Sequence, residues 1–186
     1  MASKSEIATR ALLKLGQTRI SNIETDTSPN AIIINSIFNN VRDELLQSYP
    51  WNFAIKRTDL AADVVAPTWG YDSSFPLPVD FLRLLEIKDI TDYSIENNSI
   101  LCDEVGPIYI KYIYRVTDVG LLPSLFNELF SVSLAVEACD KITNNQQLLQ
   151  SLILQKKQIL DRATSTDAIE NPPEYFEDDA WLTARL

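Results

Sequence analysis

The spacing of apolar residues changes twice along this chain of 186 residues. Up to Pro50, and again from Pro123, apolar side chains recur every three or four positions, which predicts amphipathic helices. Between these prolines they come in short or alternating runs broken by Pro, Gly, Asn and Asp, a pattern typical of strands and turns. We therefore expect an α+β fold with a β-rich insertion (51–121) between a helical N-terminal part (3–50) and a helical C-terminal part (122–163).

Two helices are expected at each end of the chain, giving a bundle of about four helices. Gly16 supplies a C-terminal stop for the first, and Ser28-Pro29 caps the second. The last two should form an antiparallel hairpin, and the whole of residues 1–166 is expected to be a single domain. The expected helices span residues 3–15, 28–50, 123–142 and 146–163.

The middle segment is expected to contain strands at 54–60, 81–90, 99–102 and 108–115, with turns at 96–98 and 103–107. Pro76 and Pro78 exclude a central-strand position before Asp80, so they mark a corner that leads into a strand. Arg83 lies next to this corner. It either pairs with Asp80 or crosses a subunit boundary, and both alternatives are open at this point.

A second corner lies where the helical part meets the β-rich insertion. Pro50 fixes a change of direction, with large rings on both sides of it. We expect this corner to bury Trp51 and Phe53. The alternative is a site at which these rings stack on a ligand.

The last residues, 167–186, are acidic and contain Pro172-Pro173, so an extended C-terminal tail is expected. Tails that merely solvate a protein avoid large aromatic residues, whereas this one carries Tyr175, Phe176 and Trp181. Something should receive these rings. It is either a partner protein or the tail's own subunit.

The residues needed for most kinds of active site are missing from the sequence. The chain has no histidine, its two cysteines are isolated from each other, and its four glycines are too scattered to form a phosphate-binding loop. We expect no metal, no cofactor and no catalytic residues, and we interpret Cys102 and Cys139 as free thiols in the core. A carboxylate-dependent glycosidase is a weaker alternative, with Glu86 and Asp89, or Asp103 and Glu104, as its acid and base.

Charge and hydropathy limit the possible partners. The net charge of −10 argues against a surface that neutralises phosphates, so specific binding of nucleic acid is not expected. No stretch approaches the roughly 20 apolar residues of a membrane span, and the first residues do not resemble a signal peptide. These features predict a protein that stays inside a cell and has no membrane partner.

Five motifs occur in fixed order over almost the whole chain. They are IATRALLKLG (7–16), VRDELL (41–46) running into PWNFA (50–54), FPLPVDFLRL (75–84), KYIYRVTD (111–118), and the helical stretch formed by 125–126 and 134–143. In this order the chain resembles the tail tubular protein A family of podovirus-type phages. Members of this family are adaptors between the portal and the tail nozzle.

The resemblance implies a non-enzymatic virion protein at the head-tail junction, present in the host cytoplasm during assembly. It implies a homo-oligomeric ring of about twelve subunits, built from heterologous contacts, through which genomic DNA passes without specific binding. The helices would form the ring wall, and the β-rich insertion would face the nozzle. By analogy, the C-terminal tail is expected to reach the portal, and a cellular scaffold protein of the same layout is the alternative. The expected portal-contacting residues are Tyr175, Phe176, Trp181, Arg185 and Leu186.

Overall fold

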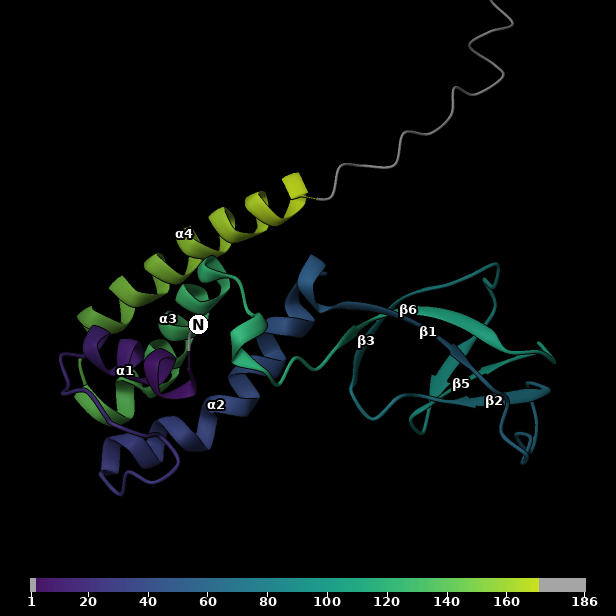
Figure 1. The fold of residues 1–186 in the computed structure, drawn as a ribbon, viewed down its shortest axis with the longest axis horizontal. Helices are drawn as coiled ribbons and strands as arrows, with labels where there is room; N and C mark the ends of the chain where they lie inside the picture. Colours follow the sequence, from purple (N-terminus) through teal and green to yellow (C-terminus); the bar gives the residue numbers. More distant parts are fainter. Residues whose placement is uncertain (1–2, 171–186) are drawn as a thin grey trace, which may run out of the picture.

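The protein has a helical lobe and a β-lobe that lie side by side (Figure 1). The structure is a computed structural model that describes residues 3–170. The helices are α1 (Lys4–Lys14), α2 (Pro29–Ser48), α3 (Ser124–Thr143) and α4 (Gln146–Glu170), with short 3-10 helices η1 (Asn52–Ala54) and η2 (Val119–Leu121). The strands are β1 (Ile55–Leu60), β2 (Ser73–Pro76), β3 (Phe81–Ile87), β4 (Ser94–Glu96), β5 (Ser99–Cys102) and β6 (Ile108–Tyr114). The expected α+β class and the order of its parts are confirmed.

The helical lobe is built around α3, which packs against α1, α2 and α4. Its sequence is apolar nearly all round, and residues on every side of it are buried, as a central helix requires. The rings of Phe38 and Phe130 meet at a centroid distance of 4.7 Å where α2 crosses α3. α3 and α4 form the expected helical hairpin.

The ends of the helices are set by local chemistry that the sequence displays. The Ser3 hydroxyl accepts a hydrogen bond from the backbone N–H of Glu6, and the Ser28 hydroxyl accepts one from Ala31. Gly16 has the left-handed φ of 70° that ends α1. Between α3 and α4, Asn144 takes the left-handed conformation, and the Asn145 side chain caps the first turn of α4.

The end of α4 differs from the sequence-based expectation. The helix runs to Glu170, so the prediction that it stops at residue 163 and that an extended tail begins at 167 is wrong for residues 164–170. Asp167 accounts for the difference, because its carboxylate accepts hydrogen bonds of 3.1 and 3.2 Å from the backbone N–H of Asn52. The Asn52 side chain in turn donates to the Asp167 backbone carbonyl at 2.6 Å. This long-range attachment holds the last turn of α4 against the start of the β-lobe.

The β-lobe consists of two antiparallel three-stranded sheets that face each other. Sheet A has the order β1-β6-β3, and sheet B has the order β2-β5-β4. Apolar side chains of the two sheets form a second core that is distinct from the core of the helical lobe. Cys102 lies in the β-lobe core and Cys139 in the helical core, both as buried free thiols, as expected.

The strands follow the predicted positions, with three differences. β2 and β4 were not predicted, because each is very short and occupies an edge of sheet B. β3 ends at Ile87 rather than at residue 90, since Asp89 has a left-handed φ of 60° that interrupts the strand. The predicted turn between β4 and β5 is confirmed, with Asn97 and Asn98 both in the left-handed region.

Candidate functional site

The aromatic corner after α2 is part of the core. Trp51 is 2% exposed, and its indole Nε1 donates a hydrogen bond of 2.8 Å to the carbonyl of Leu45. Its ring packs edge-on against Tyr49 and Phe126, and Phe53 packs against Phe126 as well. The expected burial is confirmed for Trp51, whose indole has no free face on which a ligand could stack, whereas Phe53 is only partly buried.

The second predicted corner is held by Asp80, which bonds different residues from the expected one. Its carboxylate accepts hydrogen bonds from the Lys56 ammonium at 2.8 Å and from the Tyr112 hydroxyl at 3.0 Å. Arg83 instead donates to the backbone carbonyl of Gln47 at 2.9 Å, so the first of the two alternatives, pairing with Asp80 in the same subunit, is not observed. The physical reason is that residues 80 and 83 lie on either side of a bulge in β3. Pro76 lies in the edge strand β2, as its missing N–H requires.

The environment of Asp80 favours its ionised form. Partial burial raises the pKa of this carboxyl, but the hydrogen bonds from Lys56 and Tyr112 outweigh burial and hold the pKa below its ordinary value. The same contact raises the pKa of Lys56. Asp80 is therefore a charged anchor between β1, β6 and the entrance to β3.

Polar contacts across the lobe junction fix the two lobes relative to each other. The Arg115 guanidinium lies 2.9 Å from the Asp43 carboxylate on α2, which also pairs with Arg42. The Gln47 side chain donates to the Leu82 carbonyl at 3.2 Å, beside the contact between Gln47 and Arg83. The chain itself also passes between the lobes twice, from α2 to β1 and from β6 to α3. These connections and contacts hold the two lobes in one arrangement.

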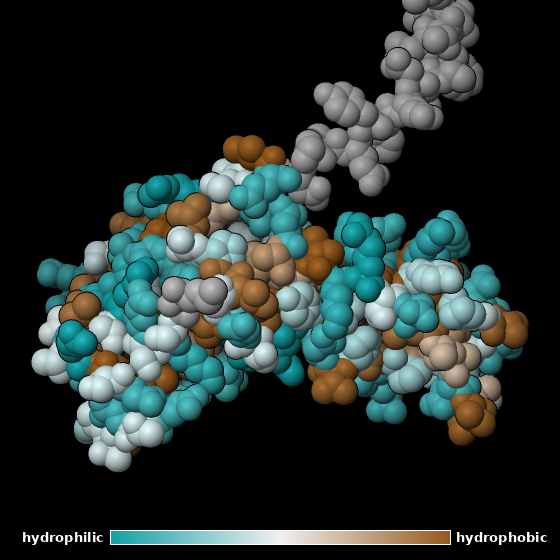
Figure 2. Space-filling model, viewed as in Figure 1, coloured by the Kyte–Doolittle hydropathy of each residue, from teal (hydrophilic) through white to brown (hydrophobic). Residues whose placement is uncertain are grey.

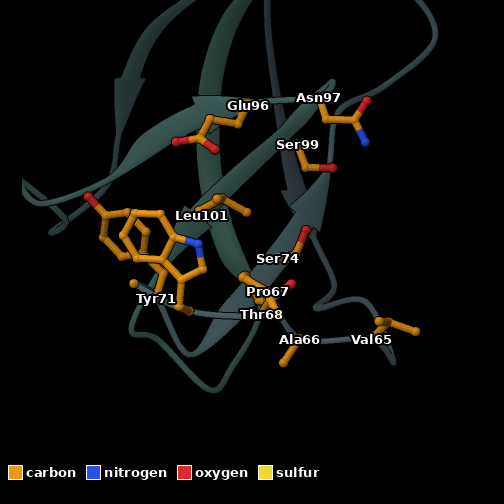
Figure 3. Close-up of a pocket in the computed structure, with 12 residues that line it drawn as sticks. Val65, Ala66, Pro67, Thr68, Tyr71, Ser74, Glu96, Asn97, Ser99 and Leu101 are labelled. Atoms are coloured by element: carbon orange, nitrogen blue, oxygen red, sulfur yellow. The ribbon is translucent and has the colours of Figure 1, made fainter.

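A pocket of about 340 Å³ lies in the β-lobe, between the loop that precedes β2 and the hairpin of β4 and β5. Its polar groups, among them Glu96, Ser74 and Ser99, are spread around the rim and do not converge on one point (Figure 3). The neighbouring loop exposes Val64, Val65 and Trp69 to solvent. This arrangement suits the docking of an apolar surface better than catalysis on a small substrate.

The carboxylates considered for glycoside hydrolysis lie in open solvent. The side chains of Glu86 and Asp89 are 65% and 85% exposed, and each has only a long contact of 4.0 Å to a lysine. Asp103 and Glu104 are also exposed. A general acid of this type needs a site that is sheltered from water, and these four side chains have no such shelter.

Two exposed helix faces in the helical lobe carry no charge. On α2 the face comprises Ile32, Asn35, Ser36 and Asn39, and on α4 it comprises Gln147, Gln150, Ser151 and Leu154. Both sets follow the same helical spacing. α2 and α4 lie on opposite sides of the lobe, with α1 and α3 between them (Figure 1).

These faces stand out because the chain as a whole has a net charge of −10. Each contains a large apolar residue in water, since Ile32 is 58% and Leu154 is 64% exposed. In the space-filling view, apolar side chains also gather at the waist between the lobes and at the far end of the β-lobe (Figure 2). Depletion of charge around exposed apolar residues is characteristic of protein interfaces.

No family model and no curated protein matches the chain. Among the described residues, no helix is long and apolar enough to cross a membrane, and no group of three potential ligand side chains could hold a metal ion.

The residues expected to contact a portal, Tyr175, Phe176, Trp181, Arg185 and Leu186, lie outside the described residues. The sequence analysis missed the faces on α2 and α4. A signal was present, because residues 144–155 and 29–40 contain almost no charged side chains. Periodicity shows which residues of a helix are apolar, but it does not show which polar face stays uncovered by the rest of the fold.

Proposed function

We propose that this chain is a non-enzymatic structural subunit of a short-tailed phage, the adaptor that forms a ring between the portal and the tail nozzle. The observation that carries the proposal is the pair of charge-free faces on opposite sides of the helical lobe. A closed ring of identical subunits needs two different surfaces, because one face of each subunit meets another face of its neighbour. The α4 face of one subunit and the α2 face of the next fill these roles.

The β-lobe supplies the contact to the next tail component in this proposal. It projects from the helical lobe with its own core, so a ring of helical lobes would carry a set of β-lobes (Figure 1). The exposed loop with Val64, Val65 and Trp69 offers each β-lobe an apolar docking point. Aromatic anchors such as an exposed tryptophan commonly dominate the binding energy of protein interfaces.

The lack of residues typical of an active site supports a structural role rather than a catalytic one. The chain has no histidine, and the candidate carboxylates stand in open water. Its net charge of −10 per subunit repels DNA and lets genomic DNA slide through a channel instead of binding to it. In this proposal the portal contact belongs to the C-terminal tail.

The ring interface is tested with one variant on each face. Ile32→Asp destroys the α2 face and Leu154→Asp destroys the α4 face, while the exposed positions leave both cores intact. Native mass spectrometry, at concentrations at which the unaltered chain assembles, should show no rings with either variant. Val105→Asp, at an exposed turn of the β-lobe, is the matched control and should form rings normally.

The mixture of the two variants decides whether the interface is head-to-tail. Ile32→Asp subunits keep an intact α4 face, and Leu154→Asp subunits keep an intact α2 face. An equimolar mixture should therefore form one-to-one pairs and stop there, because no free matching face remains. Rings from either variant alone, or pairs within one variant, would contradict the proposed contact.

A further inference from the structure

A groove of about 480 Å³ opens where α4 ends against the β-lobe. Its floor is partly apolar, formed by Ile55 of β1 and Leu85 of β3, and Lys111 of β6 stands at its edge. Asp167 and Ala168 of the last turn of α4 form one wall. The last described turn of α4, which ends at Glu170, therefore lies at this groove.

The sheet beside the groove carries two basic side chains that lie opposite each other on neighbouring strands. Arg57 on β1 and Lys111 on β6 are direct cross-strand partners, so their side chains share the outer face of sheet A. Like charges opposite each other destabilise a sheet unless an anion lies between them. Lys111 has only a 4.0 Å contact to Glu86, and no carboxylate among residues 3–170 pairs with Arg57.

The sequence that follows α4 matches this surface in order and in charge. Tyr175 and Phe176 come first, followed by the acidic run Glu177-Asp178-Asp179. An extended chain covers ~3.3 Å per residue, so residue 177 can lie up to ~23 Å from residue 170. This length is enough for the aromatic pair to contact the apolar floor and for the acidic run to contact the two basic side chains beyond it.

We infer that the C-terminal segment of the same subunit folds back into this groove, with Tyr175 and Phe176 on Ile55 and Leu85 and the acidic run beside Arg57 and Lys111. The segment and its binding surface are joined covalently a few residues away, so the contact forms at a high effective concentration. The acidic run supplies a carboxylate for Arg57 and a second one for Lys111, whose contact with Glu86 is long at 4.0 Å. This inference concerns the isolated subunit and does not depend on the ring.

The test is zero-length carbodiimide cross-linking of the full chain, which joins a lysine to a carboxylate only when the two touch. Peptide mass spectrometry should find Lys111 linked to Glu177, Asp178 or Asp179. Lys157, exposed on α4, is the control lysine in the same molecule and should give no link to this run. A mixture of 14N- and 15N-labelled chains separates links within one subunit from links between subunits, and the link to Lys111 should be found within one subunit.

Two variants show whether the link depends on the proposed contacts. Arg57→Glu places a negative charge beside the acidic run, and like-charge contact should lower the yield of the Lys111 link about tenfold. Removing both rings, with Tyr175→Ser and Phe176→Ser, should lower the yield in the same direction.

Equal links to Lys111 and Lys157, links only between subunits, or yields unchanged by both variants would each overturn the inference. The measurement uses the chain without a portal, so such a result would leave the proposed ring untested and intact. Conversely, loss of ring assembly would not affect the cross-link.

Discussion

Asp80 shows how one side chain can hold several parts of the β-lobe together. It bonds Lys56 of β1 and Tyr112 of β6, and its own backbone carbonyl accepts from the N–H of Arg115 at 2.7 Å. The Tyr112 ring is almost completely buried, so its hydroxyl depends on this carboxylate for an acceptor. Sequence analysis identified Asp80 as a corner residue but offered only Arg83 as a possible partner, because a bulge in β3 is not visible in a sequence pattern.

Asp80→Ala should lower the free energy of unfolding by about 1–2 kcal/mol at neutral pH, since it removes two hydrogen bonds to a partly screened charge. The folded pKa of Asp80 is depressed, so its contribution is complete above the ordinary aspartate pKa and is lost as pH falls through the folded value. Urea unfolding of both proteins should therefore give a difference that shrinks below about pH 4. Asp140→Ala, at an exposed position on α3, is the control and should change the free energy of unfolding by less than about 0.5 kcal/mol.

At the scale of elements, the sequence predicts helices better than strands. Caps such as Ser28-Pro29 and stops such as Gly16 determine where a helix begins or ends through contacts with residues next to them in the sequence, so these ends can be predicted from short sequence patterns. β2 and β4 escape this approach because strands of three or four residues carry too little periodicity. The order of strands in the two sheets depends on contacts between distant residues and was not predicted.

The last turn of α4 depends on such a distant contact, between Asp167 and Asn52. Asp167→Ala should remove the two hydrogen bonds from the Asn52 N–H to the carboxylate and let the turn fray, although the backbone carbonyl of residue 167 still accepts from the Asn52 side chain. Hydrogen exchange would detect this as faster exchange of the amides of residues 165–170. Asp167→Asn keeps an oxygen that can accept from the Asn52 N–H, so this turn should stay protected. Equal exchange in both variants would show that the attachment does not hold the turn.

The pH dependence of this element has the opposite sign to that of Asp80. Burial raises the pKa of Asp167, the N–H of Asn52 opposes this change, and Glu170 adds to it. The ionised form is therefore disfavoured in the folded state, and Asp167 should stabilise the protein relatively more as pH falls through its raised pKa. In Asp167→Asn this contribution to the pH dependence should be absent.

At the scale of the whole molecule, the composition excludes much more than it identifies. The lack of histidine and the scattered glycines predict no histidine-based active site and no phosphate-binding loop, and the apolar patterns predict the order helix, β-insertion, helix. They do not predict that the insertion builds a core of its own or that α2 and α4 end up on opposite sides of α3. The charge-free faces indicate a pair of interfaces only because they lie on opposite sides of the lobe. A single polar, uncharged helix face is an ordinary solvated surface.

The central claim is that identical subunits meet head to tail through these faces and close a ring on a portal. Electron microscopy of the purified chain, mixed with a portal protein encoded in the same genome, tests this claim most directly. The account predicts a rotationally symmetric ring of extra density on the tail-facing end of the portal. In this ring the helical lobes of neighbouring subunits touch, and the β-lobes project from them. Bare portal rings beside unassembled protein would contradict it.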